Sequence, residues 1–129
     1  KKCDLLIASR YLTNSKIKNW SIQRRIFSKL ANLLAQLFLQ INVTDYTNGY
    51  RIYSKVAAKK IVKECGKIGD GFIVLSEILL KIHQSKLKIM EIDSFFINRT
   101  RGESSVNFSL ILQSLFGLFK LFLIKFKKI

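Results

Sequence analysis

The chain has 129 residues, 49% of them hydrophobic, which is enough to bury the core of one domain and excludes an intrinsically disordered protein. Its 23 lysine and arginine residues against 8 acidic residues give a formal net charge of +15, so we expect an anionic partner. The ten phenylalanines lie mostly in apolar runs, where they are poorly placed to stack on bases, which favours lipids or phosphorylated small molecules over nucleic acid.

A strand and a long helix are predicted for the first third of the chain. Residues 3–9 form a short apolar run of the length of a buried strand. Residues 10–19 are a polar connection, and Asn19 is expected to cap a helix over residues 20–41. Because the chain starts with Lys1 in this strand-like segment and shows no signal peptide, we expect it to be the back half of a longer protein.

The predicted helix over residues 20–41 has one polar and one apolar face. Arg24 and Ser28 lie one turn apart on the polar face, where a guanidinium and a hydroxyl can hold a phosphate group together. The polar row continues through Asn32, Gln36 and Gln40. The opposite face carries Ile22, Ile26, Leu30, Leu33 and Leu37. This division favours a substrate that is partly lipid and partly anion.

The middle of the chain is predicted to contain a loop and two helices. Residues 42–51 are rich in turn formers, and a helix is expected over residues 54–65, ended by Gly66. The glycines in residues 66–71 predict a tight or flexible loop before a second helix over residues 72–85. Both helices are short enough to be elements of one domain.

The last part of the chain is predicted to hold strands and a long apolar helix. Residues 87–97 are rich in β-forming side chains, and a charged loop follows over residues 99–105. Residues 106–126 are apolar except for a narrow polar stripe that includes Lys120, and a helix of that length reaches roughly 30 Å. A charge in the centre of a membrane span costs about 2.5–3.5 kcal/mol, so a helix lying in the membrane interface is favoured over a span. Packing on the domain's own core is the third alternative.

Five short groups of residues follow one another along the chain at a distinctive spacing. They are Ala8-Ser9-Arg10-Tyr11; Trp20, Arg24, Ser28, Ala31 and Asn32; Asp45 with Thr47, Gly49, Tyr50 and Arg51; Gly71-Phe72 with Glu77; and Glu91-Ile92 with Phe96, Arg99, Gly102 and Ser104. In this order they resemble the carboxyl-terminal half of the polyprenyl-phosphate sugar transferases among the family-2 glycosyltransferases, typified by dolichyl-phosphate mannosyltransferase. Departures from the family pattern are Ala8 for glycine, Tyr50 for phenylalanine and Ser105 for lysine.

The resemblance implies a fold and a reaction. The fold is α/β, with the carboxyl-terminal half of a GT-A (Rossmann-like) glycosyltransferase domain over residues 1–105 and an amphipathic, membrane-associated helix over residues 106–129. The implied reaction transfers a hexose, mannose or glucose, from a nucleotide sugar (GDP-mannose or UDP-glucose) to a polyprenyl or dolichyl phosphate. It takes place at the cytoplasmic face of the membrane, where the chain is expected to be peripheral or anchored by its last helix.

The resemblance also implies a divalent metal, Mg²⁺ or Mn²⁺. In this family the metal is held by an Asp-x-Asp motif in the amino-terminal half, and the present chain has no such motif. Its two cysteines, Cys3 and Cys65, lack metal-ligand spacing and are expected to be reduced thiols. We therefore expect the metal ligands to lie outside this chain, which would carry the acceptor side of the site and be inactive alone.

Individual residues receive roles from the same resemblance. Arg10, Arg24, Ser28 and Arg99 match residues that gather the phosphates of donor and acceptor, and they form the expected catalytic set. The expected substrate-binding residues are Tyr11, Trp20, Asn32, Asp45, Thr47, Arg51, Glu77 and Ser104. A polyprenyl phosphate oxygen is already anionic near neutral pH and needs no strong base to attack the anomeric carbon. The task of the protein is then to hold two anionic groups close together.

Three of these residues also have simple structural interpretations. Asp45, in Asp-Tyr-Thr, is as well suited to an Asx turn as to catalysis. Arg51 can pair with Asp45 or face a phosphate. Glu77 can lie near the site or form an ion pair with Lys81, one turn away on its own helix.

Two other functions compete with the transferase. A non-catalytic basic module that binds anionic membrane surfaces explains the charge and the last helix, but it does not explain the ordered motifs. A nucleic-acid-binding domain explains only the charge, and the chain has no recognised motif for it.

Overall fold

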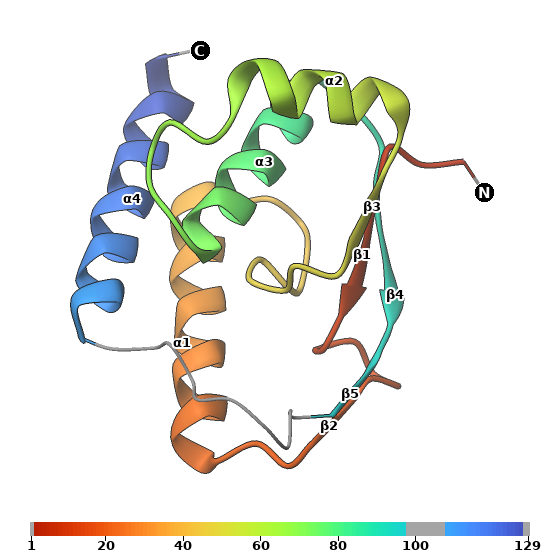
Figure 1. The fold of residues 1–129 in the computed structure, drawn as a ribbon, viewed down its shortest axis with the longest axis vertical. Coiled ribbons are helices and arrows are strands. Elements are labelled where there is room, and N and C mark those ends of the chain that lie inside the picture. The colour runs from red at the N-terminus through yellow and green to blue at the C-terminus, as the bar shows by residue number, and fades with distance from the viewer. Residues whose placement is uncertain (1, 98–107, 128–129) are drawn as a thin grey trace.

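The computed structural model describes residues 2–97 and 108–127. In chain order the elements are β1 (Leu5–Ser9), β2 (Lys16–Lys18), α1 (Ile22–Leu39), β3 (Arg51–Tyr53), α2 (Lys55–Glu64), α3 (Phe72–Gln84), β4 (Ile89–Asp93), β5 (Phe95–Ile97) and α4 (Phe108–Lys127). Figure 1 shows β1, β3 and β4 on one side of the molecule and α1 and α4 on the other. This mixed α/β architecture is compatible with the expected partial Rossmann-like fold.

The central sheet has the strand order β3-β1-β4, with β1 parallel to β4 and antiparallel to β3. The predicted strand at the start of the chain and the predicted β-rich segment are both confirmed. In the parallel pair, Ile7 is in register with Glu91 and Ser9 with Asp93. The carboxyl ends of β1 and β4 therefore meet at one edge of the sheet, which is where ligands bind in open α/β folds.

The sequence pattern does not predict two of the strands. β2 lies within the segment expected to be a polar connection, and it pairs in parallel with β5. β3 lies at the end of the expected loop and pairs with β1. Strands of three residues are too short to show an alternating pattern, so they depend on a neighbour that the fold brings alongside.

Helix α1 is capped by Ser21, and the prediction of Asn19 as the cap is wrong. The side chain of Ser21 accepts a hydrogen bond from the backbone N–H of Arg24 at 3.2 Å. Asn19 has a φ of 61°, a left-handed conformation that turns the chain before the helix begins. Both residue types are common caps, and the turn at Asn19 decides between them.

The polar row of α1 faces the interior and the apolar row faces outward. Ser28 and Asn32 are buried, whereas Ile22 is 77% exposed. The other members of the apolar row are also exposed: Ile26, Leu30, Leu33 and Leu37. Unlike a typical amphipathic surface helix, α1 buries polar side chains beside the apolar Ala35 and Leu39 and exposes its predicted apolar row. Buried polar groups need hydrogen-bond partners. The loop after α1 supplies them for Asn32, and Tyr11 supplies one for Ser28.

Helices α2 and α3 form as predicted, and Glu77 of α3 is buried. The side chain of Ser54 caps α2, and the Oε2 atom of Glu77 accepts a hydrogen bond from the backbone N–H of Gly66 at 2.9 Å. The ion pairs of the described residues do not include Glu77 with Lys81, so the expected surface pair is wrong. Burial, followed by the nearby Glu77 carboxylate, raises the pKa of the Cys65 thiol to about 11.

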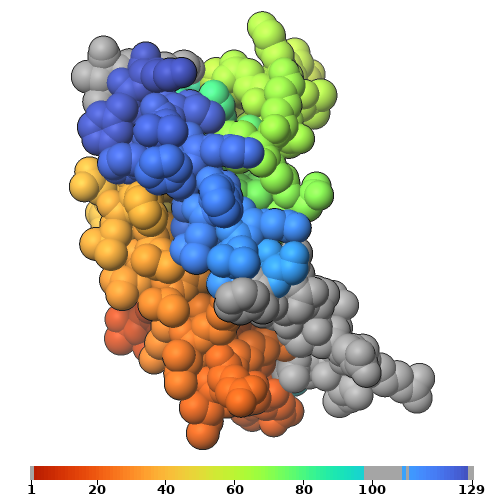
Figure 2. All heavy atoms as spheres, turned by 90° about the vertical axis from the view of Figure 1, so that its left-hand side faces the viewer, coloured from red at the N-terminus to blue at the C-terminus, as the bar shows by residue number. Residues whose placement is uncertain are grey.

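Helix α4 packs on the core with one side and leaves apolar residues exposed on the other. Leu118 and Leu121 belong to the core, and the Nζ atom of Lys125 donates to the carbonyl oxygen of Leu39 at 2.8 Å, at the carboxyl end of α1. Figure 2 shows α4 and α1 side by side on one face. The exposed apolar residues of α4 are Leu112, Leu115, Phe116, Phe119, Leu123 and Phe126.

The structure tests only part of what the sequence predicts for the last helix and for the domain division before it. Within residues 2–97 and 108–127, no helix is both long enough and apolar enough to cross a membrane. Helix α4 packs on the core, as the third alternative for this helix predicts. Its other side is exposed and apolar, so a position in the membrane interface stays a proposal. The predicted division of the chain between residues 105 and 106 lies outside the described residues.

Candidate functional site

A buried ion pair lies at the carboxyl end of β1. Arg10 directly follows this strand, and its Nε and Nη2 atoms each donate to one carboxylate oxygen of Asp45 at 2.8 Å. The backbone N–H of Arg10 also donates to Asp45 at 3.0 Å. The side chains are 8% and 0% exposed. This two-pronged geometry fixes the plane of the guanidinium, and its Nη1 atom takes no part in these bonds.

The charge state of Asp45 follows from this pairing. Burial alone raises the pKa of its carboxyl group, but the hydrogen bonds and the charge of Arg10 outweigh burial and hold the pKa below its ordinary value of 3.8. Asp45 also accepts hydrogen bonds from the backbone N–H groups of Thr47 and Asn48, which is the predicted Asx turn. Asp45 is therefore an ionised structural acceptor that holds both the loop and Arg10.

Arg51 makes contacts that the sequence did not predict. Its guanidinium donates to the backbone carbonyl oxygens of Tyr46, Asn48 and Leu75 at 2.9–3.0 Å. It thus joins the loop to α3, while the carboxylate of Asp45 is hydrogen-bonded to Arg10. The expected pairing of Arg51 with Asp45 is wrong because Arg10 occupies that carboxylate.

Thr47 and Asn32 connect the loop to the polar face of α1. The hydroxyl of Thr47 accepts from Nη2 of Arg10 at 2.7 Å and from the side-chain amide of Asn32 at 3.3 Å. Asn32 donates to the carbonyl oxygen of Ser28 and accepts from the backbone N–H of Tyr46. The buried amide of Asn32 is therefore used to hold the loop against the helix.

Trp20 lies between two arginines at the start of α1. The guanidinium carbon of Arg24 is 4.5 Å from the centre of the indole ring, and that of Arg10 is 5.2 Å from it. Phe96 of β5 packs edge-on against the same ring at 5.4 Å. Trp20 is 8% exposed, and its buried Nε1–H has no acceptor among the described residues. The electron-rich ring face attracts both cations and keeps them close together.

Tyr11 and Ser28 complete the cluster. Their hydroxyl groups form a hydrogen bond, which places Ser28 beside the residue that follows Arg10. Around the guanidinium of Arg10 the fold thus gathers seven other residues of the predicted site: Tyr11, Trp20, Arg24, Ser28, Asn32, Asp45 and Thr47. Henceforth these residues with Arg10 are called the Arg10 cluster.

Four predicted site residues are not placed in this cluster. Arg51 and Glu77 form hydrogen bonds with the backbone atoms described above, and none of these bonds is to a residue of the Arg10 cluster. Their substrate-binding roles stay predictions without geometric support. Arg99 and Ser104 lie outside the described residues.

The sequence motifs do not assign a role to Glu91 or Thr44, which the structure places next to the cluster. Both carboxylate oxygens of Glu91 accept from the backbone N–H of Thr44, at 2.9 and 3.0 Å. Glu91 also accepts from the hydroxyl of Thr44 at 2.9 Å and from the backbone N–H of Asp45 at 3.1 Å. The sequence signals are the place of Glu91 in the fifth motif group and within a predicted strand. Neither gives its partners, which lie 46 and 47 residues away.

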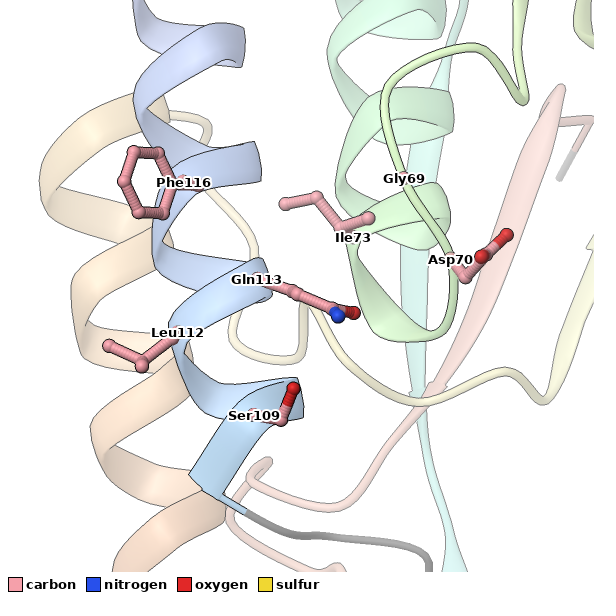
Figure 3. Close-up of a pocket in the computed structure, with 7 residues that line it drawn as sticks. All are labelled: Gly69, Asp70, Ile73, Ser109, Leu112, Gln113 and Phe116. Carbon is pink, nitrogen blue, oxygen red and sulfur yellow. The ribbon is translucent and has the colours of Figure 1, made fainter.

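A separate cavity of about 540 Å³ lies between α3 and α4. Figure 3 shows Gln113 of α4 extending toward Ile73 of α3 across it. The lining residues are Gly69, Asp70, Ile73, Ser109, Leu112, Gln113 and Phe116. It shares no residue with the Arg10 cluster. In the described part of the chain, no group of three or more His, Cys, Asp or Glu residues could hold a metal ion.

The Arg10 cluster is suited to binding an anion. It holds two guanidinium groups against one indole ring and a serine hydroxyl one helical turn from Arg24. Its indole N–H has no acceptor within the described part of the chain. The carboxylate of Asp45 is directed at the Nε and Nη2 atoms of Arg10 and leaves Nη1 for a ligand. Arginines with this density of donors recognise phosphate groups.

Two curated proteins match most of the chain. The polyprenol monophosphomannose synthase of Mycolicibacterium smegmatis is 27% identical over 113 residues, which cover 88% of this chain and 42% of that protein. The undecaprenyl-phosphate mannosyltransferase of Micrococcus luteus is 30% identical over 105 residues, which cover 81% of this chain and 42% of that protein. The chain thus matches less than half the length of either relative. No family model matches it. These homologues confirm the resemblance inferred from the motifs.

Proposed function

We propose that this homologue of polyprenyl-phosphate mannosyltransferases forms the acceptor side of a transferase that moves a hexose from a nucleotide sugar to a polyprenyl phosphate. The observation that carries the proposal is the convergence of Arg10 and Arg24 on Trp20, next to the Tyr11–Ser28 hydrogen bond. These residues come from the end of β1 and the start of α1. The names of the two relatives support mannose as the sugar, and GDP-mannose is the nucleotide sugar we favour over UDP-glucose.

The arrangement supports a mechanism based on positioning and charge. A polyprenyl phosphate oxygen carries a negative charge near neutral pH, so it can attack the anomeric carbon directly, with inversion, while the nucleoside diphosphate leaves. Arg10 and Arg24 would reduce the repulsion between the attacking phosphate and the leaving diphosphate. Ser28 would donate a hydrogen bond to the same phosphate. A divalent metal bound with the diphosphate would supply further positive charge, and we propose that its ligands lie outside this chain.

The exposed apolar faces of α1 and α4 support a place at the membrane surface. Ile26, Leu33 and Leu37 of α1 are exposed, and so are Phe116 and Phe119 of α4. Figure 2 shows the two helices side by side. Large contiguous apolar surfaces rarely face water in soluble proteins. With a net charge of +15, the chain fits an anionic bilayer surface, which we place at the cytoplasmic face. The isoprenoid chain of the acceptor would then lie beside α1.

Membrane binding can be tested on this apolar face. Replacing Leu33 and Leu37 together with glutamine is expected to weaken binding to vesicles of phosphatidylglycerol and phosphatidylcholine by about tenfold or more, because two apolar side chains no longer leave water. Val62→Gln, on exposed α2, is the matched control and should leave vesicle affinity unchanged. Equal affinity of the double variant and the wild type in a flotation assay would contradict the proposed orientation.

The phosphate site itself can be tested through Trp20, the only tryptophan of the chain. Its indole N–H gives a single NMR signal, which we expect to move downfield when a short-chain polyprenyl phosphate is added in detergent micelles, since a phosphate oxygen would become its acceptor. The same titration with inorganic phosphate and with the uncharged polyprenol separates the contribution of the anion from that of the lipid. Saturable movement with polyprenyl phosphate but not with polyprenol supports the acceptor site.

The competing membrane-binding module gives a different result. If anionic vesicles bind the chain equally well after Arg10, Arg24 and Arg99 are all replaced with alanine, and the indole signal does not respond to polyprenyl phosphate, the non-catalytic interpretation is favoured. A normal fold of the triple variant, judged by circular dichroism, is the control for this comparison.

A further inference from the structure

Glu91 supports the Arg10 cluster from the neighbouring strand without being part of it. It lies on β4, in register with Ile7 of β1, and Arg10 begins directly after β1 ends. Its carboxylate accepts hydrogen bonds from Thr44 and from the backbone N–H of Asp45 at 2.9–3.1 Å. One parallel strand pair therefore sets the position of both Arg10 and the carboxylate that holds the loop.

A continuous series of bonds leads from Glu91 to the guanidinium. Glu91 fixes the backbone at Thr44 and Asp45. The carboxylate of Asp45 in turn accepts hydrogen bonds from Nε and Nη2 of Arg10. The hydroxyl of Thr44 is also 2.6 Å from that of Ser9, the last residue of β1. Because successive hydrogen bonds join these groups, a change at Glu91 would shift the loop and, through Asp45, the guanidinium of Arg10.

A carboxylate is the side chain that this position requires. All of its described partners are donors: two backbone N–H groups and one hydroxyl. Glutamine at this position would turn an NH₂ group toward one of those donors and lose an acceptor. The oxygens of Glu91 are already used by the loop, so the residue would act through Asp45 and not on the substrate.

We propose that Glu91 is a positioning residue that sets the direction of the Arg10 guanidinium through the loop at Thr44 and Asp45. It thereby also sets the direction of Nη1, which bonds to no other described residue. The inference rests on the proposed function for the identity of the ligand, the phosphate of a polyprenyl phosphate. The hydrogen bonds from Glu91 through Asp45 to Arg10 are independent of the proposed function. Glu91→Gln is expected to weaken binding of that phosphate by about tenfold, because Arg10 would be held in several orientations.

A double-mutant cycle tests whether Glu91 acts through Arg10. The affinity for a short-chain polyprenyl phosphate is measured by calorimetry for the wild type, Glu91→Gln, Arg10→Ala and the double variant. We expect the tenfold loss from Glu91→Gln to disappear in the Arg10→Ala background, because no guanidinium is left to position. An equal loss in both backgrounds would overturn the proposal, since a merely structural effect does not depend on Arg10. Glu64→Gln, at the partly exposed ion pair with Lys60 on α2, is the matched control.

A second measurement needs no substrate and separates this proposal from the proposed function. The Nε–H group of Arg10 is hydrogen-bonded to Asp45 and is expected to give a sharp, slowly exchanging NMR signal in the wild type. Glu91→Gln should broaden it. Thr44→Val removes the hydroxyl bonds to Glu91 and Ser9 but keeps the backbone N–H bonds to Glu91, and should broaden it to a lesser extent. An unchanged signal in both variants would overturn the positioning role. If the wild type binds no polyprenyl phosphate while the signal behaves as expected, only the proposed function fails.

If Glu91→Gln does not fold, Thr44→Val is the variant that tests the positioning role of Glu91. It keeps the backbone N–H bonds to Glu91 and fills the same space, so it is expected to fold. A weaker phosphate affinity in this variant that depends on Arg10 supports the proposal. A wild-type affinity together with a sharp Arg10 signal contradicts it.

Discussion

Replacing Arg24 with alanine in the full-length protein is expected to lower the rate of hexose transfer by about 10²–10³-fold, the cost of removing one donor that stabilises developing charge. Arg24 is partly exposed at the start of α1, and its guanidinium stacks 4.5 Å from the centre of the Trp20 ring. It contributes little to the core, so the midpoint of thermal unfolding should change by less than about 3 °C. The measurement is transfer of radiolabelled mannose from GDP-mannose to a polyprenyl phosphate in detergent.

Arg25 offers a matched control on the same helix. It is exposed, and its guanidinium donates to the carbonyl oxygen of Ile17 at 3.1 Å, away from Trp20 in the contacts described. Arg25→Ala removes the same charge one residue away and should keep most of the transfer activity. A similar loss in both variants would mean that the rate depends on overall positive charge. Unchanged activity in Arg24→Ala would remove Arg24 from the acceptor site.

Asp45→Asn is expected to reduce the free energy of unfolding by about 3–5 kcal/mol, which is the usual cost of removing one charged partner from a buried ion pair. Arg10 is 8% exposed and would keep its charge without a carboxylate to balance it. The neutral amide also presents NH₂ donors to the backbone N–H groups of Thr47 and Asn48. Urea unfolding of both proteins at neutral pH measures the difference. Glu64→Gln, at the partly exposed i,i+4 pair with Lys60, should cost only about 0–1 kcal/mol.

The same variant should change how stability depends on pH. The pKa of Asp45 in the folded protein lies below its ordinary value of 3.8, so the folded state holds this proton less tightly than the unfolded state. The stabilisation is therefore complete above 3.8 and is lost as the pH falls through the lower, folded pKa. We expect the stability difference between wild type and Asp45→Asn to shrink on acidification to about pH 3. A difference that stays constant over this range would contradict the assigned ion pair.

Local spacing was sufficient to predict much of the site. Arg24 and Ser28 share a helix face because four residues make about one turn, and that relation does not depend on the rest of the fold. The strand that ends before Arg10, the Asx turn at Asp45 and the two helices after residue 53 are also local in origin. In each case the partner lies within a few residues, so the pattern of residue types carries the information.

The direction of α1 could not be predicted in this way. Its apolar row, with Leu33 and Leu37, has the pattern of a helix that buries its apolar side, yet these residues are exposed. The polar side faces inward because Asn32 finds Thr47 and the backbone of Tyr46 in the loop. Only the position of that loop, and the surface shared with α4, decides which face of the helix is covered.

The chain by itself therefore determined the residue types of the proposed anion site, their order, and the helix and strand that present them. The tertiary structure decided which of them meet: Asp45 takes Arg10 and not Arg51, Glu77 turns to Gly66, and Glu91 holds the loop from a distant strand. The physical reason is that a buried charge or amide must be satisfied by whichever donors and acceptors the packed chain brings within about 3 Å. Those partners lie up to 47 residues away, where local spacing gives no information.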